Sequence, residues 1–364
     1  MDIAKIPLIT TKTNPSLQLS SGRCGLNQRP LYLGKQSFSS ALSFKQNVKV
    51  SVILPIYNQE KFLPRALDSL VNQTLNDVEF ICVNDGSKDK SLEIMDKYAQ
   101  KDSRIKIINQ KNQGCGCARN NGLKIAKGEY IAFLDPDDWL EKNALEELYK
   151  KSKKQNCDML VFDFKRVNES GKTIGRFNLK KRLQRFYDIN PNENFYWRDI
   201  KPKVLGGMYP VSWNKFFKRE LIKNNKLHFA KCNLAEDNVF VFAATLKAKS
   251  IGYLDKCLYN YRIHKNSTLR SVSDKNLCFF KAIDSVKKMI NNLGFAQELE
   301  KELDGYVLRF VSFHAHQVKS LSKLKDICLK KLTPRQNKLL LERLDANPKL
   351  FNILNSIIRH KKLR

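Results

Sequence analysis

Residues 130–138 of the chain have the sequence YIAFLDPDD. Its first five positions are apolar and include β-branched and aromatic side chains, which is typical of a buried strand. An acidic turn with Asp135, Asp137 and Asp138 follows without a break. The sequence therefore predicts a core strand that ends in a cluster of carboxylates.

Similar apolar stretches repeat before and after this strand. Strands are expected at residues 50–54, 78–83, 105–108 and 158–162, and helices with an apolar stripe at residues 60–72, 91–100 and 117–126. This alternation predicts an α/β fold, in which a mostly parallel sheet has helices on both faces. Because such sheets bind ligands at the carboxyl ends of their strands, the polar loops at residues 55–58, 84–87 and 135–138 should meet at one edge.

The acidic turn is a candidate metal site. Carboxylates this close together repel one another, and a bound cation would remove that cost. Mg²⁺ and Mn²⁺ commonly bind one or two carboxylates together with substrate phosphates, and such a metal would neutralise a leaving diphosphate. The spacing leaves a second interpretation open, in which the segment is a polar turn and Asp138 caps a following helix.

The chain of 364 residues is strongly basic. Its 66 Lys and Arg against 36 Asp and Glu give a net charge of +30, which favours nucleic acid, anionic lipid headgroups or phosphorylated small molecules as partners. Nine cysteines with scattered spacing, and no signal peptide before them, favour reduced thiols in the cytoplasm. No apolar run approaches the length needed to span a bilayer.

Three regions are expected along the chain. Residues 1–46 are polar and predicted to be a poorly ordered leader. Residues 47–268 should form the sheet domain, with a first half at 47–162 and a second half at 163–268. Residues 269–364 are predicted to be helical and basic. Within them, residues 319–364 would either dock on an anionic membrane face or form a helical bundle with a solvated basic side.

Further motifs surround the acidic turn. They are VSVILPIYN (residues 50–58), SLVNQT (69–74), VNDGS (83–87), NQG (112–114), ARNNG (118–122) and GEYIAFLDPDDW (128–139). In this order and spacing they resemble the family 2 glycosyltransferases, whose fold is called GT-A. The resemblance covers residues 48–162 and is specific for the family but not for the sugar. It implies that residues 47–162 form a nucleotide-sugar half and residues 163–268 an acceptor half.

The resemblance implies donor-binding roles, residue by residue. Near the base and ribose would lie Pro55, Tyr57 and Glu60, and Asp85 would accept a hydrogen bond from the base, typically uracil. Gly114 and Arg119 would lie under the nucleotide, with Arg119 able to reach a phosphate. Asp135 would contact the ribose or a metal-bound water, and Asp137 would ligate Mn²⁺ or Mg²⁺. The other interpretation of Tyr57 is core packing.

Motifs in the second half extend the resemblance. LAEDNVF (234–240) is similar to a family segment that supplies the base, so Asp237 is expected to take the acceptor's proton; the alternative is an acidic helix start. SWNKFFKR (212–219) resembles a stretch on the acceptor side. YRIHKNST (261–268) resembles a segment that closes over the diphosphate, where Arg262 would reach phosphates and His264 would be a further metal ligand.

The function expected from the resemblance is the inverting transfer of a sugar from a nucleotide-sugar donor to a glycan or lipid-linked acceptor in surface polysaccharide synthesis. UDP is the nucleotide expected on the donor. The protein would be cytoplasmic and could lie at the inner face of the cell membrane. Three alternatives remain: a transferase of another nucleotide-activated group such as a phosphorylated polyol, a donor-binding member without catalysis, and a basic nucleic-acid-binding protein. Because the crevice is acidic and no basic stripe is interleaved with aromatics, no nucleic acid partner is expected.

Overall fold

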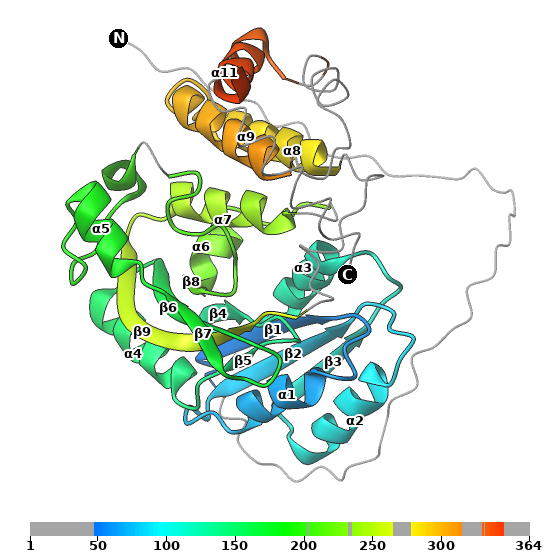
Figure 1. Ribbon diagram of the computed structural model, residues 1–364. Helices are drawn as coiled ribbons and strands as arrows, with labels where there is room; N and C mark the ends of the chain where they lie inside the picture. Colours follow the sequence, from blue (N-terminus) through cyan, green and yellow to red (C-terminus); the bar gives the residue numbers. More distant parts are fainter. Residues whose placement is uncertain are drawn as a thin grey trace, which may run out of the picture. The chain divides into compact units, whose positions relative to one another are not determined.

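The computed structural model describes residues 47–201, 204–231, 235–264, 278–314, 330 and 332–345. All of them belong to one compact unit, Gln46–Arg364. The predicted leader at residues 1–46 lies outside the described residues, as does most of the segment 319–364. The described chain folds as a nine-stranded sheet flanked by helices (Figure 1).

The strands lie in the order β3-β2-β1-β4-β8-β6-β9-β5, with β7 also paired to β6. Their bounds are β1 Val50–Ile56, β2 Val78–Asn84, β3 Ile105–Asn109, β4 Tyr130–Phe133, β5 Trp139–Leu140, β6 Met159–Val167, β7 Thr173–Phe177, β8 Lys215–Lys218 and β9 Ile251–Arg262. Pairs among β1 to β4 are parallel, as is the β6–β9 pair, whereas β5, β7 and β8 run antiparallel to their neighbours. The α/β prediction with flanking helices is confirmed, and the sheet is mixed: β1 to β4 form its parallel part, and four of the eight pairs among the described strands are antiparallel.

The helices connect these strands and continue beyond the sheet. They are α1 Leu63–Val71, α2 Ser91–Lys101, α3 Cys115–Ile125, α4 Ala144–Gln155, α5 Lys180–Tyr187, the 3₁₀ helix η1 Trp197–Ile200, α6 Arg219–Asn224, α7 Glu236–Lys247, α8 Cys278–Asn292, α9 Glu300–His314 and α11 Pro334–Asp345. No helix in the described ranges is both long and apolar enough to cross a membrane.

Alternating side chains of the central strand β1 build two separate cores. Val50, Val52 and Leu54 pack on one face with apolar residues of α1, α2 and α4. Ile53 packs on the other face with residues of α3, α6 and α7. This alternation is the period of a strand buried on both faces, and it explains why β1 carries almost only apolar side chains.

Parallel register brings the predicted loops to one edge of the sheet. Ile56 at the end of β1 lies opposite Asn84 at the end of β2, and β4 runs parallel to β1 on its other side. The loops after β1, β2 and β4 therefore leave the sheet together, which confirms the expected convergence.

The C-terminal helices share the core that covers α7. Val286 of α8 and Val307 of α9 belong to the same buried cluster as Phe240 of α7, and Figure 1 shows α8, α9 and α11 grouped together. The helical character predicted for this region is confirmed for α8, α9 and α11, the part of it that the structure describes. The boundary placed at residues 268 and 269, like that between the two halves of the sheet domain, stays a prediction.

Candidate functional site

Asp138 fastens the acidic turn to β9. The residue is 1% exposed, and its carboxylate accepts hydrogen bonds from the Tyr259 hydroxyl and the Arg262 backbone N–H, both at 2.7 Å. The Tyr259 oxygen in turn accepts the backbone N–H of Asp135 at 3.2 Å. Burial raises the pKa of Asp138 well above its usual range. The residue that follows begins β5 rather than a helix, so the helix-cap interpretation of Asp138 is wrong.

Asp137 lies beside His264, the other predicted metal ligand. Asp137 Oδ2 and His264 Nε2 are 2.9 Å apart, and the imidazole packs on the Phe62 ring with centroids 4.7 Å apart. A carboxylate oxygen and an imidazole nitrogen are both metal-ligating groups, so Asp137 and His264 would hold a Mn²⁺ or Mg²⁺ ion from two sides of the turn. Because no set of three or more ligating side chains gathers in the described residues, substrate phosphates and water would complete the shell.

Arg119 links the acidic turn to the second half of the chain. It lies in α3 and is 3% exposed. Its Nη2 donates to Asp135 Oδ1 at 2.7 Å, while Nη1 donates to Glu236 Oε1 at 2.9 Å and to Asp237 Oδ1 at 3.0 Å. One buried guanidinium therefore holds the turn after β4 and the start of α7 together.

Three carboxylates around one guanidinium leave an excess of negative charge. Burial raises the pKa of Asp135 to about 6; Arg119 opposes this rise, and Asp137 and Asp237 add to it. Burial and the neighbouring Asp237 also raise the pKa of Glu236. A cluster whose carboxylates resist ionisation favours an incoming cation, in agreement with a metal at Asp137.

Asp237 is oriented from two sides. Besides the bond from Arg119, its Oδ1 accepts the Ser212 hydroxyl and its Oδ2 accepts the Ser212 backbone N–H, both at 3.2 Å. The turn into α7 passes through Ala235, a non-glycine residue with φ 55°, which is a strained backbone conformation of the kind found at functional sites. A carboxylate held in this way suits a general base, whose position relative to the acceptor must be fixed.

Asp85 fixes the loop that leads into α3. It is 2% exposed and accepts hydrogen bonds from the Gln110 side chain and from the backbone N–H groups of Gln113 and Gly114, all at 2.8 Å. Gly114 has φ 87°, which glycine adopts without strain. Since an ionised carboxylate has about four acceptor positions, one remains for the predicted bond from the base. That bond stays a prediction.

The three residues predicted beside the base and ribose differ in burial and in their contacts. Pro55 is buried in β1 opposite Val83. Tyr57 follows β1 and is 43% exposed, so the core-packing interpretation of its ring is wrong. Glu60 accepts the Lys90 backbone N–H at 3.0 Å and so ties the loop after β1 to the start of α2.

The Arg262 side chain lies between two aromatic rings. Its guanidinium carbon is 4.6 Å from the centre of the Phe62 ring and 5.0 Å from that of Trp139. The residue is 6% exposed, and its Nε and Nη2 have no hydrogen-bond partner among the described residues. Buried donors without acceptors cost free energy, and a phosphate would relieve that cost. The predicted contact between Arg262 and a phosphate therefore has a physical basis.

Comparison with known proteins identifies the family. The sequence profile of glycosyl transferase family 2 matches residues 51–229. A relative named as the putative glycosyltransferase EpsH of Bacillus subtilis (strain 168) is 33% identical over 267 residues, covering 71% of this chain and 74% of EpsH. The chain belongs to glycosyl transferase family 2. A poly(ribitol-phosphate) beta-glucosyltransferase of Bacillus spizizenii is 36% identical to this family 2 glycosyltransferase over 231 residues, covering 62% of this chain and 34% of that protein.

The fold of this glycosyltransferase matches that of S. aureus TarS. The crystal structure of TarS 1–349 in complex with UDP-GlcNAc aligns with a TM-score of 0.63 at 22% identity, covering 86% of this chain and 92% of that chain. The GT-A fold expected from the motifs is thereby confirmed. In this glycosyltransferase, Arg119 joins Asp135 of the turn after β4 to Glu236 and Asp237 at the start of α7.

Sequence reasoning assigned no role to Glu236, Ser212 or Tyr259, which position the site. Glu236 stands in the motif 234–240 and Ser212 in the motif 212–219, so their membership of these motifs was the available signal. Tyr259 had no such signal. Its hydroxyl reaches Asp138 because β9 pairs with β5, with Tyr259 opposite Leu140, and that pairing cannot be deduced from local pattern.

Proposed function

We propose that this glycosyltransferase is an inverting enzyme that moves a sugar from a UDP-linked donor to a glycan or lipid-linked acceptor in surface polysaccharide synthesis. The observation that carries the proposal is the Arg119 guanidinium, which lies 2.7 Å from Asp135 and 3.0 Å from Asp237. A carboxylate of the donor loop and the candidate base thus flank one cation. The UDP-GlcNAc complex of TarS supports a UDP-sugar donor, and the name of the poly(ribitol-phosphate) relative supports a polymer as the acceptor.

The transfer needs one proton acceptor and a stabilised leaving group. An acceptor hydroxyl attacks the anomeric carbon, the bond from this carbon to the diphosphate oxygen breaks, and the electron pair leaves with the nucleoside diphosphate. Asp237 takes the hydroxyl proton. Attack opposite the leaving group inverts the anomeric configuration. A Mn²⁺ or Mg²⁺ ion held by Asp137 and His264 would neutralise charge on the diphosphate, and the Arg262 donors that lack a partner among the described residues would bind its oxygens.

Calorimetry with UDP-, GDP- and CDP-linked sugars, with and without Mn²⁺, tests the donor class. We expect metal-dependent binding of a UDP-sugar. Metal-dependent binding of a CDP-linked polyol alone would favour transfer of another activated group on the same fold. If no nucleotide binds in a metal-dependent way, the proposal fails.

Two variants separate metal binding from proton transfer. Asp137→Ala should abolish the metal dependence of donor binding, because one of two protein ligands is lost. Asp237→Asn should keep donor binding within about twofold but lower turnover by at least about 100-fold, since general-base catalysis contributes about 10²–10⁴. The exposed carboxylate of Asp255, paired with Lys180 at the surface, supplies the control Asp255→Asn. Unimpaired turnover in Asp237→Asn would clear Asp237 of the base role.

A cytoplasmic location at the inner face of the membrane is part of the proposal. A nucleotide-sugar donor and the net charge of +30 support it. Sedimentation with vesicles should show binding that rises with anionic lipid and falls with salt; equal recovery with neutral vesicles would contradict it.

A further inference from the structure

Lys215 is a charged side chain with no exposed surface, at the start of β8. The two residues after it, Phe216 and Phe217, are also fully buried. Its Nζ lies within hydrogen-bond distance of four oxygens: the carbonyls of Met208 (3.2 Å), Tyr209 (2.7 Å) and Val211 (2.8 Å), and Asn214 Oδ1 (2.8 Å). An ammonium has three N–H donors, so this group is fully satisfied by oxygen.

A buried ammonium carries a large desolvation free energy. Removing it from water is unfavourable before any bond forms, and none of the four partners of Lys215 Nζ in the described part of the chain is a carboxylate. Burial lowers the pKa of Lys215 to about 7, and the charge of Asp237 opposes this shift. An apolar side chain would pack here at lower cost. The carbonyls that Lys215 binds must therefore explain its presence.

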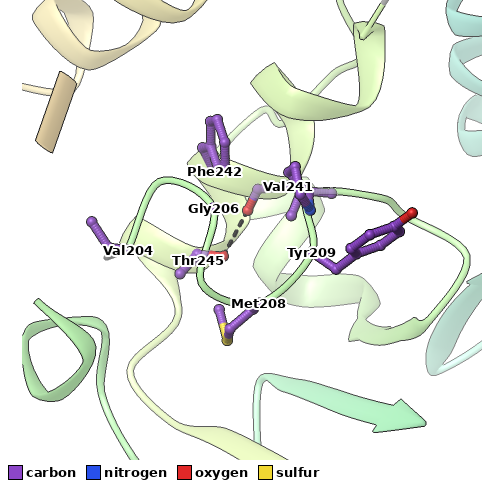
Figure 2. Close-up of a pocket in the computed structure, with 8 residues that line it drawn as sticks. Val204, Gly206, Met208, Tyr209, Val241, Phe242 and Thr245 are labelled. Atoms are coloured by element: carbon purple, nitrogen blue, oxygen red, sulfur yellow. Dashed lines mark hydrogen bonds between the residues drawn. The ribbon is translucent and has the colours of Figure 1, made fainter. Parts of the chain in front are cut away.

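Three of the four acceptors belong to one irregular loop, residues 204–212, which we call the 204–212 loop. It contains Gly206 with φ 138° and Tyr209 with φ 56°, so hydrogen bonds from side chains outside the loop are needed to hold its backbone. Figure 2 shows this loop beside α7, where Gly206, Met208 and Tyr209 line a small hollow together with Val241 and Phe242 of the helix. Lys215 binds the end of the loop that is nearer to β8.

One peptide group of the loop connects Lys215 with the candidate base. The carbonyl of Val211 accepts the Lys215 ammonium at 2.8 Å, and the N–H of the same peptide group, on Ser212, donates to Asp237 Oδ2 at 3.2 Å. Because the peptide group is planar and rigid, fixing its oxygen fixes the direction of its N–H. The positive charge on the oxygen side also polarises the N–H toward the carboxylate.

We propose that Lys215 is a positioning residue for the transfer, which holds the peptide group between Val211 and Ser212 so that its N–H orients the Asp237 carboxylate. The role rests on the proposed function, in which Asp237 is the base. Lys215 itself touches neither donor nor acceptor, and acts through the 204–212 loop.

The test compares Lys215→Met with Lys218→Met, a change on the same strand at a lysine that is partly exposed. Hydrogen–deuterium exchange measures the loop, because the amides of Gly206, Val211 and Ser212 are hydrogen-bonded in it. Calorimetry measures UDP affinity, and UDP release from the bound donor measures turnover.

Lys215→Met should speed exchange at Val211 and Ser212 by at least about 10-fold, which corresponds to about 1.4 kcal/mol of lost protection. Exchange in β1 to β4 and UDP affinity should stay within about twofold, while UDP release falls by at least about 10-fold. Lys218→Met should leave all three unchanged. This split between affinity and turnover separates positioning from general destabilisation.

Unchanged loop exchange or unchanged UDP release in Lys215→Met overturns the proposal, and so does a loss of protection spread evenly over the sheet. If Lys215→Met does not fold, Lys215→Gln, which keeps part of the donor set, is judged by the same readouts. If the wild-type chain binds no nucleotide, the proposed function fails, whereas the exchange comparison still decides whether Lys215 holds the loop.

Discussion

Replacing Arg119 by methionine removes the only cation that bonds to Asp135, Glu236 and Asp237 in the described residues. Breaking a buried ion pair by deleting one partner costs about 3–5 kcal/mol, because the remaining charge is left uncompensated. Three carboxylates lose their partner here, but Asp135 and Glu236 already have raised pKa values and can take up protons instead. We therefore expect a loss of about 3–5 kcal/mol in the free energy of unfolding rather than a multiple of it.

The loss should depend on pH with a definite sign. In the wild type, burial raises the pKa of Asp135 to about 6, although Arg119 lowers it; without Arg119 that pKa rises further. A carboxyl group with a raised pKa in the folded state stabilises the fold at low pH and loses this contribution as pH rises through the folded value. The variant should therefore be closest to the wild type near pH 5 and most destabilised above pH 7.

Urea unfolding at both pH values measures the difference, with Arg198→Met as the matched control. Arg198 binds Glu298 at an exposed site, where an ion pair contributes about 0–1 kcal/mol. A loss below about 1 kcal/mol in Arg119→Met, or a loss that does not grow with pH, would refute the view that Arg119 neutralises this cluster.

Two further predictions concern packing and buried charge. Gly116→Ala should cost about 1–3 kcal/mol in urea unfolding, because a Cβ there would lie 2.6 Å from the Ala230 carbonyl oxygen; wild-type stability would contradict this close approach. Burial raises the pKa of Asp163 to about 6, so the wild type loses about 1.4 kcal/mol of stability per pH unit from this group between its unfolded and folded pKa values. Asp163→Asn should lack that loss and gain stability relative to the wild type above pH 6, and an identical pH profile would rule out this account.

The first half of the fold is readable from sequence because its signals are local. Apart from Glu79, the segment 78–83 is apolar, and the structure extends it by one residue to Asn84. In contrast, the segment 173–177 forms β7 with mostly exposed side chains, so no apolar pattern marks it. Its pairing with β6 depends on a hairpin whose register local sequence does not show.

Some features of the candidate site also follow from local sequence, whereas others depend on the folded chain. The position of Asp135 and Asp137 at a strand end follows from residues 130–138 alone. The bonds from Arg119 to Glu236 and Asp237 join residues more than a hundred positions apart, and no periodicity predicts them. Family resemblance named Arg119 and Asp237 separately, but only the folded chain shows that they share a hydrogen bond.

The guanidinium of Arg119 also limits how this enzyme can be recombined with its relatives. A chimera that keeps residues 47–162 and imports the following segment from another chain retains Arg119 and Asp135, and needs Glu236 and Asp237 from the imported segment. If the imported segment lacks that pair, Arg119 is left with unmatched charge at a buried site, and the hybrid is destabilised before any acceptor is tried. Segments can therefore be exchanged across this junction only between chains that carry all four charged residues.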